Sequence, residues 1–233
     1  MKLPQIDTIV ALATPIGEGD ISVIRISGAD AFLIASKTFK CKSDLVNAQT
    51  HTAHFGRVVN KDGTMLDQAV AVVFRGPNSY TGEDTAELSC HGGVLVTKRI
   101  IEALIGFGAR HAQPGEFTKR AFLNGKLDLT QAEAVADLIH ARSDVAHRSS
   151  LAQLHGVLSA KVQNLRNQLI EAISLLELEL DFVEDGLELV DKSEIMGQIK
   201  RAIGNTEELA SSYKAGKIYR EGAKVVIAGP PNA

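Results

Sequence analysis

The chain has 233 residues, a hydrophobic fraction of 45%, a charged fraction of 23% and a formal net charge of −3. These values are typical of a soluble globular protein with one large or two modest domains. They exclude a global electrostatic attraction to nucleic acid, so an RNA contact would need a local patch or another part of the protein.

The cysteines and the N-terminus predict a cytoplasmic protein. The two cysteines, Cys41 and Cys90, form no CxxC motif, and the first residues lack a hydrophobic targeting core. No apolar run approaches the roughly 20 residues of a membrane helix. We therefore expect no membrane partner.

Residues 1–118 carry the signals of an α+β domain, because short apolar alternations and turn signals are mixed with helical stretches. The strand candidates are residues 7–13, 21–26, 52–59 and 66–74. Asp62-Gly63 predicts the hairpin turn between the last two. A further strand ends the segment 76–93, with Leu88 and Cys90 on one face and Glu87 on the other. The helix after it is expected to carry Val94 on its apolar stripe.

From Pro114 onward the sequence becomes mainly helical, and it predicts one helix, a turn that ends it and a second helix. Pro114 suits the first turn of a helix, and Asn124-Gly125 ends that helix because glycine accepts a left-handed backbone. Thr130 is expected to open the next helix, with Glu133 completing a capping box. This turn places Lys126 at the joint between two domains.

Residues 119–222 predict an all-α domain of long helices. Over residues 144–181, apolar residues recur at spacings of three, four and seven residues, which indicates one continuous helix. A second stripe, beginning at Ile195 and Ile199, predicts a partner helix after a break near Gly186. Two helices seldom close a core, so we expect further helical surface from elsewhere.

Residues 223–233 read as the start of a third domain. A buried strand is predicted over 225–228, and residues 229–233 match the first five positions of the P-loop G-x-x-x-x-G-K-[ST]. The Gly, Lys and Ser or Thr that complete a P-loop do not follow, so we expect no closed nucleotide site and no G domain. By itself the segment is better interpreted as an apolar tail.

Several motifs occur in order along the chain. They are DTIVA at 7–11 with ATP at 13–15, RISG at 25–28, GPNSYTGED at 76–84, Glu87 with HGG at 91–93, PGEF at 114–117 leading to KLDL at 126–129, QAEA at 131–134, and VVIAG at 225–229 with PNA at 231–233. Together they resemble the MnmE family, also called TrmE, of bacterial tRNA-modifying GTPases. That family continues with a G domain and further helices, so the resemblance covers roughly the first half of a member.

The resemblance implies a specific function. The N-terminal domain is expected to resemble the tetrahydrofolate-binding domain of aminomethyltransferases, to bind 5-formyl-tetrahydrofolate and to form a homodimer. With its flavoprotein partner MnmG, the family adds an aminomethyl-type group at C5 of the wobble uridine of certain tRNAs, using a folate one-carbon unit. GTP hydrolysis with Mg²⁺ drives a conformational cycle, and K⁺ promotes pairing of two G domains.

The family match points to Arg25, Glu87 and Lys126 as folate-binding residues. A folate binder needs a carboxylate for the pterin N–H donors and cations for the carbonyls or the acidic tail. Taken singly, each would be interpreted as a solvated or paired charge; the resemblance favours binding for all three. Asn232 and Ala233 match the family's nucleotide loop, where the asparagine contacts GTP and K⁺.

The stretch from Cys90 to Gly93 leaves alternatives open. The two glycines could hold an anion at a helix start or only let the helix pack closely on a strand, and the second is favoured. Cys90 and His91 could form a thiolate–imidazole pair. Because Cys90 shares the apolar face of Leu88, a buried inert thiol is the better prediction.

Three functions compete at this point. The first is the folate-binding and dimerising half of a tRNA modification GTPase, with no GTP hydrolysis by these residues alone. The second is a stand-alone folate-dependent aminomethyl- or formyl-transferase, which the half P-loop and the long helices oppose. The third is a structural helical adaptor, which the N-terminal motifs oppose.

Overall fold

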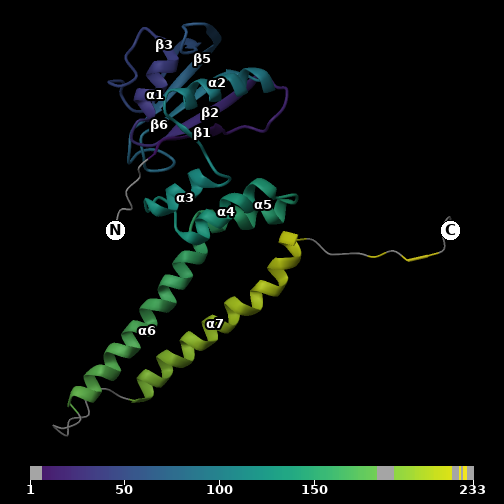
Figure 1. The fold of residues 1–233 in the computed structure, drawn as a ribbon. Coiled ribbons are helices and arrows are strands. Elements are labelled where there is room, and N and C mark those ends of the chain that lie inside the picture. The colour runs from purple at the N-terminus through teal and green to yellow at the C-terminus, as the bar shows by residue number, and fades with distance from the viewer. Residues whose placement is uncertain (1–6, 183–191, 222–225, 227, 230–233) are drawn as a thin grey trace. The chain divides into compact units, whose positions relative to one another are not determined.

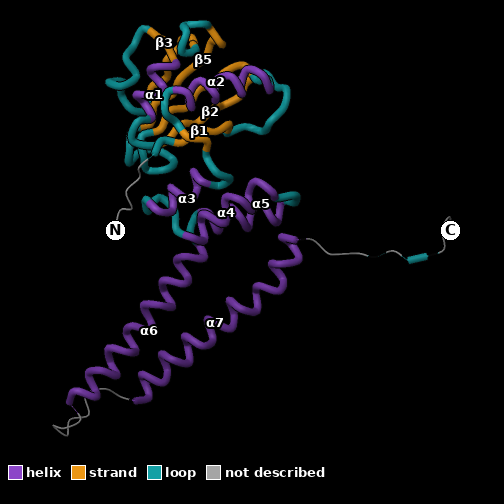
Figure 2. The backbone as a smooth tube through the Cα atoms, in the orientation of Figure 1, coloured by secondary structure: helices purple, strands orange, loops and turns teal. Residues whose placement is uncertain are grey.

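The computed structural model describes residues 7–182, 192–221, 226 and 228–229. The chain divides into two compact units, Met1–Asp128 and Leu129–Ala233. Figure 1 shows a sheet with helices in the first unit and helices in the second. In Figure 2 the strands of the described residues all belong to the first unit. The predicted α+β domain followed by a helical domain is thus confirmed.

A seven-stranded sheet organises the first unit, in the order β3-β4-β5-β6-β2-β1-β7. The strands are β1 (Ile9–Leu12), β2 (Ile21–Ser27), β3 (Phe39–Cys41), β4 (Thr52–Val59), β5 (Met65–Phe74), β6 (Thr85–His91) and β7 (Arg110–His111). Neighbours pair antiparallel except β1 and β7, which pair parallel. Gly63 has φ +84° in the turn between β4 and β5, so the predicted hairpin is confirmed.

Two helices, α1 (Ala31–Thr38) and α2 (Val94–Gly106), cover one face of the sheet. Side chains of alternate strand residues fill the core against them; Ile24 on β2 and Leu88 on β6 are opposite each other and fully buried. From α2 the core takes Ile100 and Leu104. The prediction that Val94 lies on the buried stripe is wrong, because it begins the helix and its side chain is 55% exposed.

The other face of the sheet carries half-buried polar and apolar side chains. Because strand side chains alternate, the residues between the core positions of β2, β5 and β6 point away from α1 and α2. They include Arg25 and Glu87, which pair in register. This open face therefore presents the charged residues that the sequence singled out.

A short helix, α3 (Glu116–Leu123), completes the first unit. It begins after Gly115 and not at Pro114, and Gly125 beyond it has φ +70°, as predicted for a glycine stop. The division of the chain after Asp128 lies beyond the boundary expected at residue 118. Within the first unit, the buried Arg120 of α3 forms ion pairs with Asp7 and Glu83.

The second unit contains α4 (Leu129–His140), α5 (Asp144–Leu154), α6 (Val157–Phe182) and α7 (Lys192–Glu221). The continuous helix predicted over 144–181 is wrong, because Gly156 adopts φ +80° and separates α5 from α6. Thr130 does not open α4, which begins one residue earlier. Its hydroxyl instead shares a hydrogen bond of 2.7 Å with that of Ser159.

Helices α6 and α7 pack side by side within the second unit (Figure 1). Ala172 of α6 and Ile195 and Ala202 of α7 are buried, whereas Leu169 and Ile173 are about half exposed. The predicted break near Gly186 and the predicted strand over 225–228 involve residues outside the described ranges. No helix among the described residues is both long and apolar enough for a membrane span.

Candidate functional site

Arg25 and Glu87 form the centre of the candidate site. They are directly opposite each other on the antiparallel strands β2 and β6. Arg25 Nε donates a hydrogen bond of 2.7 Å to Glu87 Oε1, and each side chain is 23% exposed. This geometry makes a charge-assisted contact that remains open to solvent on one side.

Two aromatic rings flank the guanidinium of Arg25. Its Cζ lies 4.9 Å from the ring centroid of Tyr80 and 5.5 Å from that of Phe117, within cation–π range. Tyr80 comes from the loop before β6 and Phe117 from α3, and the Tyr80 hydroxyl is 2.9 Å from that of Thr118. The loop and α3 thus each place one aromatic ring against Arg25.

The pair leaves polar atoms available to a ligand. In the part of the chain that the structure describes, Glu87 Oε2 and the two terminal nitrogens of Arg25 have no hydrogen bond. A carboxylate oxygen can accept a pterin N–H, and guanidinium nitrogens can donate to a carbonyl or carboxylate. Together with two aromatic rings, this donor and acceptor set fits one end of a folate.

Lys126 is an exposed residue that approaches the same loop. Its backbone N–H donates to the carbonyl of Ala121, which closes the turn after α3. A Cβ on Gly82, which has φ +77°, would lie 3.2 Å from Lys126 Cγ, so the stem of this lysine packs on the loop that carries Tyr80. The structure therefore pairs Arg25 with Glu87 and places Lys126 on the adjoining loop.

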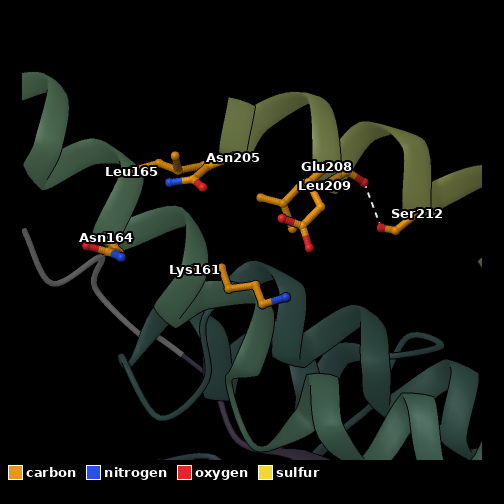
Figure 3. A pocket seen from close by; sticks show the side chains of 7 residues that line it. All are labelled: Lys161, Asn164, Leu165, Asn205, Glu208, Leu209 and Ser212. Atoms are coloured by element: carbon orange, nitrogen blue, oxygen red, sulfur yellow. Dashed lines mark hydrogen bonds between the residues drawn. The ribbon is translucent and has the colours of Figure 1, made fainter. Parts of the chain in front are cut away.

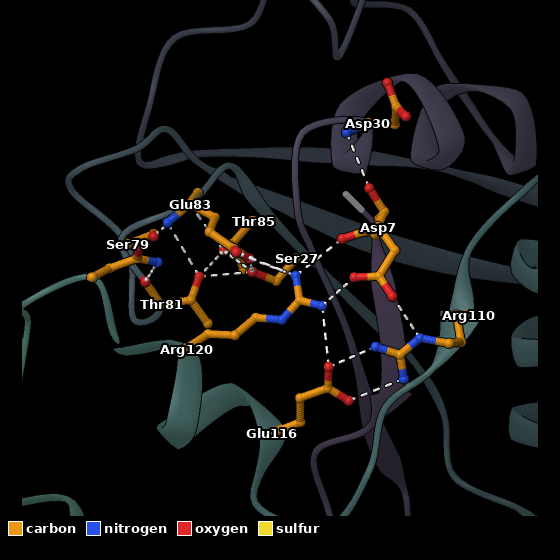
Figure 4. A network of polar contacts seen from close by, with 12 residues as sticks. Asp7, Ser27, Asp30, Ser79, Thr81, Glu83, Thr85, Arg110, Glu116 and Arg120 are labelled. Atoms are coloured by element: carbon orange, nitrogen blue, oxygen red, sulfur yellow. Dashed lines mark hydrogen bonds and ion pairs between the residues drawn. The ribbon is translucent and has the colours of Figure 1, made fainter. Parts of the chain in front are cut away.

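An ion network next to this site, buried at Arg120 and Glu83 and exposed at Asp7 and Arg110, was not predicted from the sequence. Its members are Asp7, Glu83, Arg110, Glu116 and Arg120 (Figure 4). We call these five residues the Arg120 network, because the guanidinium of Arg120 touches the carboxylates of Asp7, Glu83 and Glu116. The opposite charges of Glu116 and Arg120 at a spacing of four were a local signal for a pair. Their distant partners gave no such signal.

The network lowers the pKa values of Glu116 and Asp7. Hydrogen bonds from Arg110 are the largest cause for both Glu116, whose pKa falls from 4.5 to about 2, and Asp7, whose pKa is also lowered. Backbone and Arg120 hydrogen bonds act in the same direction on Glu116. Because the folded state favours the ionised forms, this network stabilises the protein at neutral pH.

We expect the stability contributed by Glu116 to be lost in acid. Its folded pKa is below the ordinary value of 4.5, so its contribution is complete above that pH and disappears as the pH falls toward about 2. Denaturant unfolding at pH 7, 4.5 and 3 measures this effect. A Glu116→Gln variant should lose less stability over the acid range than the unchanged chain; parallel profiles would contradict the assignment.

Cys90 is a buried thiol, as predicted. Burial raises its pKa to about 11, with a smaller effect from the charge of Asp67, and its Sγ donates to the carbonyl of Ser22. His91 points away and pairs with Asp67, at 2.7 Å between Nδ1 and Oδ1. A Cβ on Gly92 would overlap the carbonyl oxygen of Gly19, in the loop before β2, whereas a Cβ on Gly93 would meet nothing within 4 Å. Close packing at Gly92 is therefore confirmed, but against this loop and not between the helix and a strand as predicted.

A cavity of about 220 Å³ lies between α6 and α7 in the second unit (Figure 3). Its lining residues are Lys161, Asn164, Leu165, Asn205, Glu208, Leu209 and Ser212. Lys161 and Glu208 are its only charged lining residues among those described. The described residues also contain no group of three or more metal-ligating side chains. Asn232 and Ala233, predicted for the nucleotide loop, lie outside the described ranges.

Comparisons with known proteins cover nearly the whole chain. A family model described as the N-terminus of the GTP-binding protein TrmE matches residues 8–126, and a model of the MnmE helical domain matches residues 129–224. Similar curated proteins are named tRNA modification GTPase MnmE. They include those of Chlorobium phaeobacteroides (47% identical over 98% of this chain), Symbiobacterium thermophilum (46% over 97%) and Lactobacillus acidophilus (41% over 99%). The matches occupy 49% to 50% of these relatives, so the chain spans about half their length.

Proposed function

The chain belongs to the MnmE family, also called TrmE, of tRNA modification GTPases, and we propose that its first unit binds 5-formyl-tetrahydrofolate through Arg25, Glu87 and Lys126. The observation that carries this proposal is the partly exposed Arg25–Glu87 pair, whose guanidinium contacts the rings of Tyr80 and Phe117. A pair with free polar atoms beside aromatic rings suits a flat heterocycle with polar edges.

Each proposed residue has a distinct role. Glu87 accepts hydrogen bonds from the pterin N–H groups through its free oxygen. Arg25 orients Glu87 through the 2.7 Å contact and donates from its terminal nitrogens to a ligand carbonyl. Lys126, whose side chain is exposed at the adjoining loop, attracts the acidic tail. The bound folate supplies the one-carbon unit.

For the complete protein we propose the family's reaction. With a flavoprotein partner, MnmG, it adds an aminomethyl-type group at C5 of the wobble uridine of tRNA, and GTP hydrolysis with Mg²⁺ accompanies the cycle. Asn232 and Ala233 contact GTP in an intact G domain, and Asn232 contacts K⁺. The names of the curated relatives support the tRNA and GTPase parts of this proposal.

We also propose that the first unit forms the homodimer contact. The open face of the sheet supports this, because Phe55 on β4 is 69% exposed and its register partner, Val70 on β5, is half-buried. Apolar side chains on an uncovered sheet face favour contact with another surface.

The match of residues 129–224 to the MnmE helical domain supports the proposed role in a tRNA modification GTPase over that of a stand-alone folate-dependent transferase.

Calorimetric titration of the chain with 5-formyl-tetrahydrofolate tests the proposed function. We expect saturable binding, and much weaker binding of p-aminobenzoyl-glutamate, which has the acidic tail but no pterin to meet Glu87. Equal affinities for the two compounds would place recognition on the tail alone. No heat of binding with either compound would contradict the proposal.

A further inference from the structure

Arg120 is a buried cation that ties three separate segments together (Figure 4). Only 6% of this residue is exposed. Its Nη2 donates to Asp7 Oδ1 at 2.7 Å and to Glu116 Oε1 at 3.1 Å, while its Nη1 donates to the Asp7 carbonyl at 3.0 Å and to Glu83. A buried guanidinium with this many charged partners holds its surroundings in one arrangement.

Glu83 is the residue of the loop before β6 that belongs to the Arg120 network. Both of its carboxylate oxygens lie within 3.3 Å of Arg120 Nη1, and Oε2 also accepts a 2.6 Å hydrogen bond from the hydroxyl of Ser27 on β2. The Glu83 side chain is 5% exposed. The Glu83 carboxylate thus connects the loop both to β2, through Ser27, and to α3, through Arg120.

Further contacts join the same loop to α3 on both sides of Arg120. The Tyr80 hydroxyl meets that of Thr118 at 2.9 Å, and Asn124 Nδ2 donates to the carbonyl of Thr81 at 2.7 Å. Phe117, which flanks Arg25, precedes Arg120 by three residues and therefore lies near it on the helix surface. The helix that contacts the loop thus also carries the Phe117 ring of the candidate site.

We propose that Arg120 is a positioning residue for the folate site: by holding Glu83 it keeps the loop 76–84 against α3, so that Tyr80 and Phe117 both contact Arg25. This inference takes the identity of the ligand from the proposed function, whereas the contacts of Arg120 come from the structure itself. Arg120 itself touches neither Arg25 nor Glu87 in the described structure. Its influence on them passes through the loop and the helix.

An Arg120→Lys substitution tests the proposal, because lysine keeps the charge but lacks the forked donors. Arg110→Lys is the matched control: Arg110 also binds Asp7 and Glu116, yet it does not touch Glu83 and its side chain is 43% exposed. We expect Arg120→Lys to weaken 5-formyl-tetrahydrofolate binding about tenfold or more. Its backbone amides over 76–84 should exchange hydrogen faster, whereas Arg110→Lys should change neither quantity appreciably.

Glu83→Gln provides the second variant if Arg120→Lys does not fold. It removes the charge at the loop while Arg120 keeps Asp7 and Glu116 as partners, and it should show the same two effects. Unchanged exchange over 76–84 in these variants would overturn the proposal, and so would folate binding equal to that of the unchanged chain. If the unchanged chain binds no folate, the proposed function fails, while hydrogen exchange still decides the role of Arg120.

Discussion

Replacing Glu87 with alanine is expected to lower the affinity for 5-formyl-tetrahydrofolate by about 100-fold or more while the first unit stays folded. The substitution removes the free carboxylate oxygen proposed to meet the pterin, and it leaves Arg25 without the partner that orients it. The side chain is 23% exposed on the open face, so its loss creates no cavity in the core. Calorimetry measures the affinity, and circular dichroism checks the fold.

Glu102→Ala is the matched control for Glu87→Ala. Glu102 is an exposed glutamate of α2 that pairs with Lys98, so its removal changes the net charge by the same amount away from the site. The control should bind folate as the unchanged chain does. Unaltered binding by Glu87→Ala would reject the role assigned to this carboxylate.

Leu88→Ala, at the next residue of β6, is expected to lower the stability of the first unit and to leave its folate affinity unchanged. Leu88 is fully buried in the core beneath α1 and α2, so truncation leaves a cavity and should lower the free energy of unfolding by roughly 2–5 kcal/mol. Native-state hydrogen exchange of the sheet amides measures this loss in the first unit. The folded fraction should retain its folate affinity, because the side chain points away from Glu87.

Ser89→Ala serves as the control for stability. Ser89 lies on the same face as Glu87 and is half-buried, so its truncation should change the stability far less than Leu88→Ala. If Leu88→Ala and Ser89→Ala lost equal amounts of unfolding free energy, the two faces of β6 would not differ in their contribution to the core, which would contradict this assignment. Together the substitutions at 87, 88 and 89 test ligand binding and folding separately on one strand.

Strand periodicity explains why the sequence predicted the face of the site. Side chains alternate strictly along a strand, so Leu88 and Cys90 could be assigned to the core and Glu87 to the opposite face without knowing any partner. The Asp62-Gly63 turn and the stop at Gly125 were predictable for a similar reason. Each depends on a glycine that takes a positive φ locally.

Features that depend on contacts between distant residues were not predictable in this way. The pairing of Arg120 with Glu83 and Asp7 joins residues far apart in sequence, and neither partner has a local pattern that marks it. Likewise, Tyr80 could be placed in a loop, but its position over Arg25 required the fold. The end of α5 was missed for a different, local reason: the apolar recurrence over 144–181 continues across Gly156 and concealed the positive φ of this glycine.

A crystal structure of the chain with 5-formyl-tetrahydrofolate tests the central claim most directly. We expect the pterin edge to meet the Glu87 carboxylate beside Arg25, between Tyr80 and Phe117, with the glutamate tail toward Lys126. A folate bound at another surface of the first unit, with the Arg25–Glu87 pair unchanged and solvated, would contradict it.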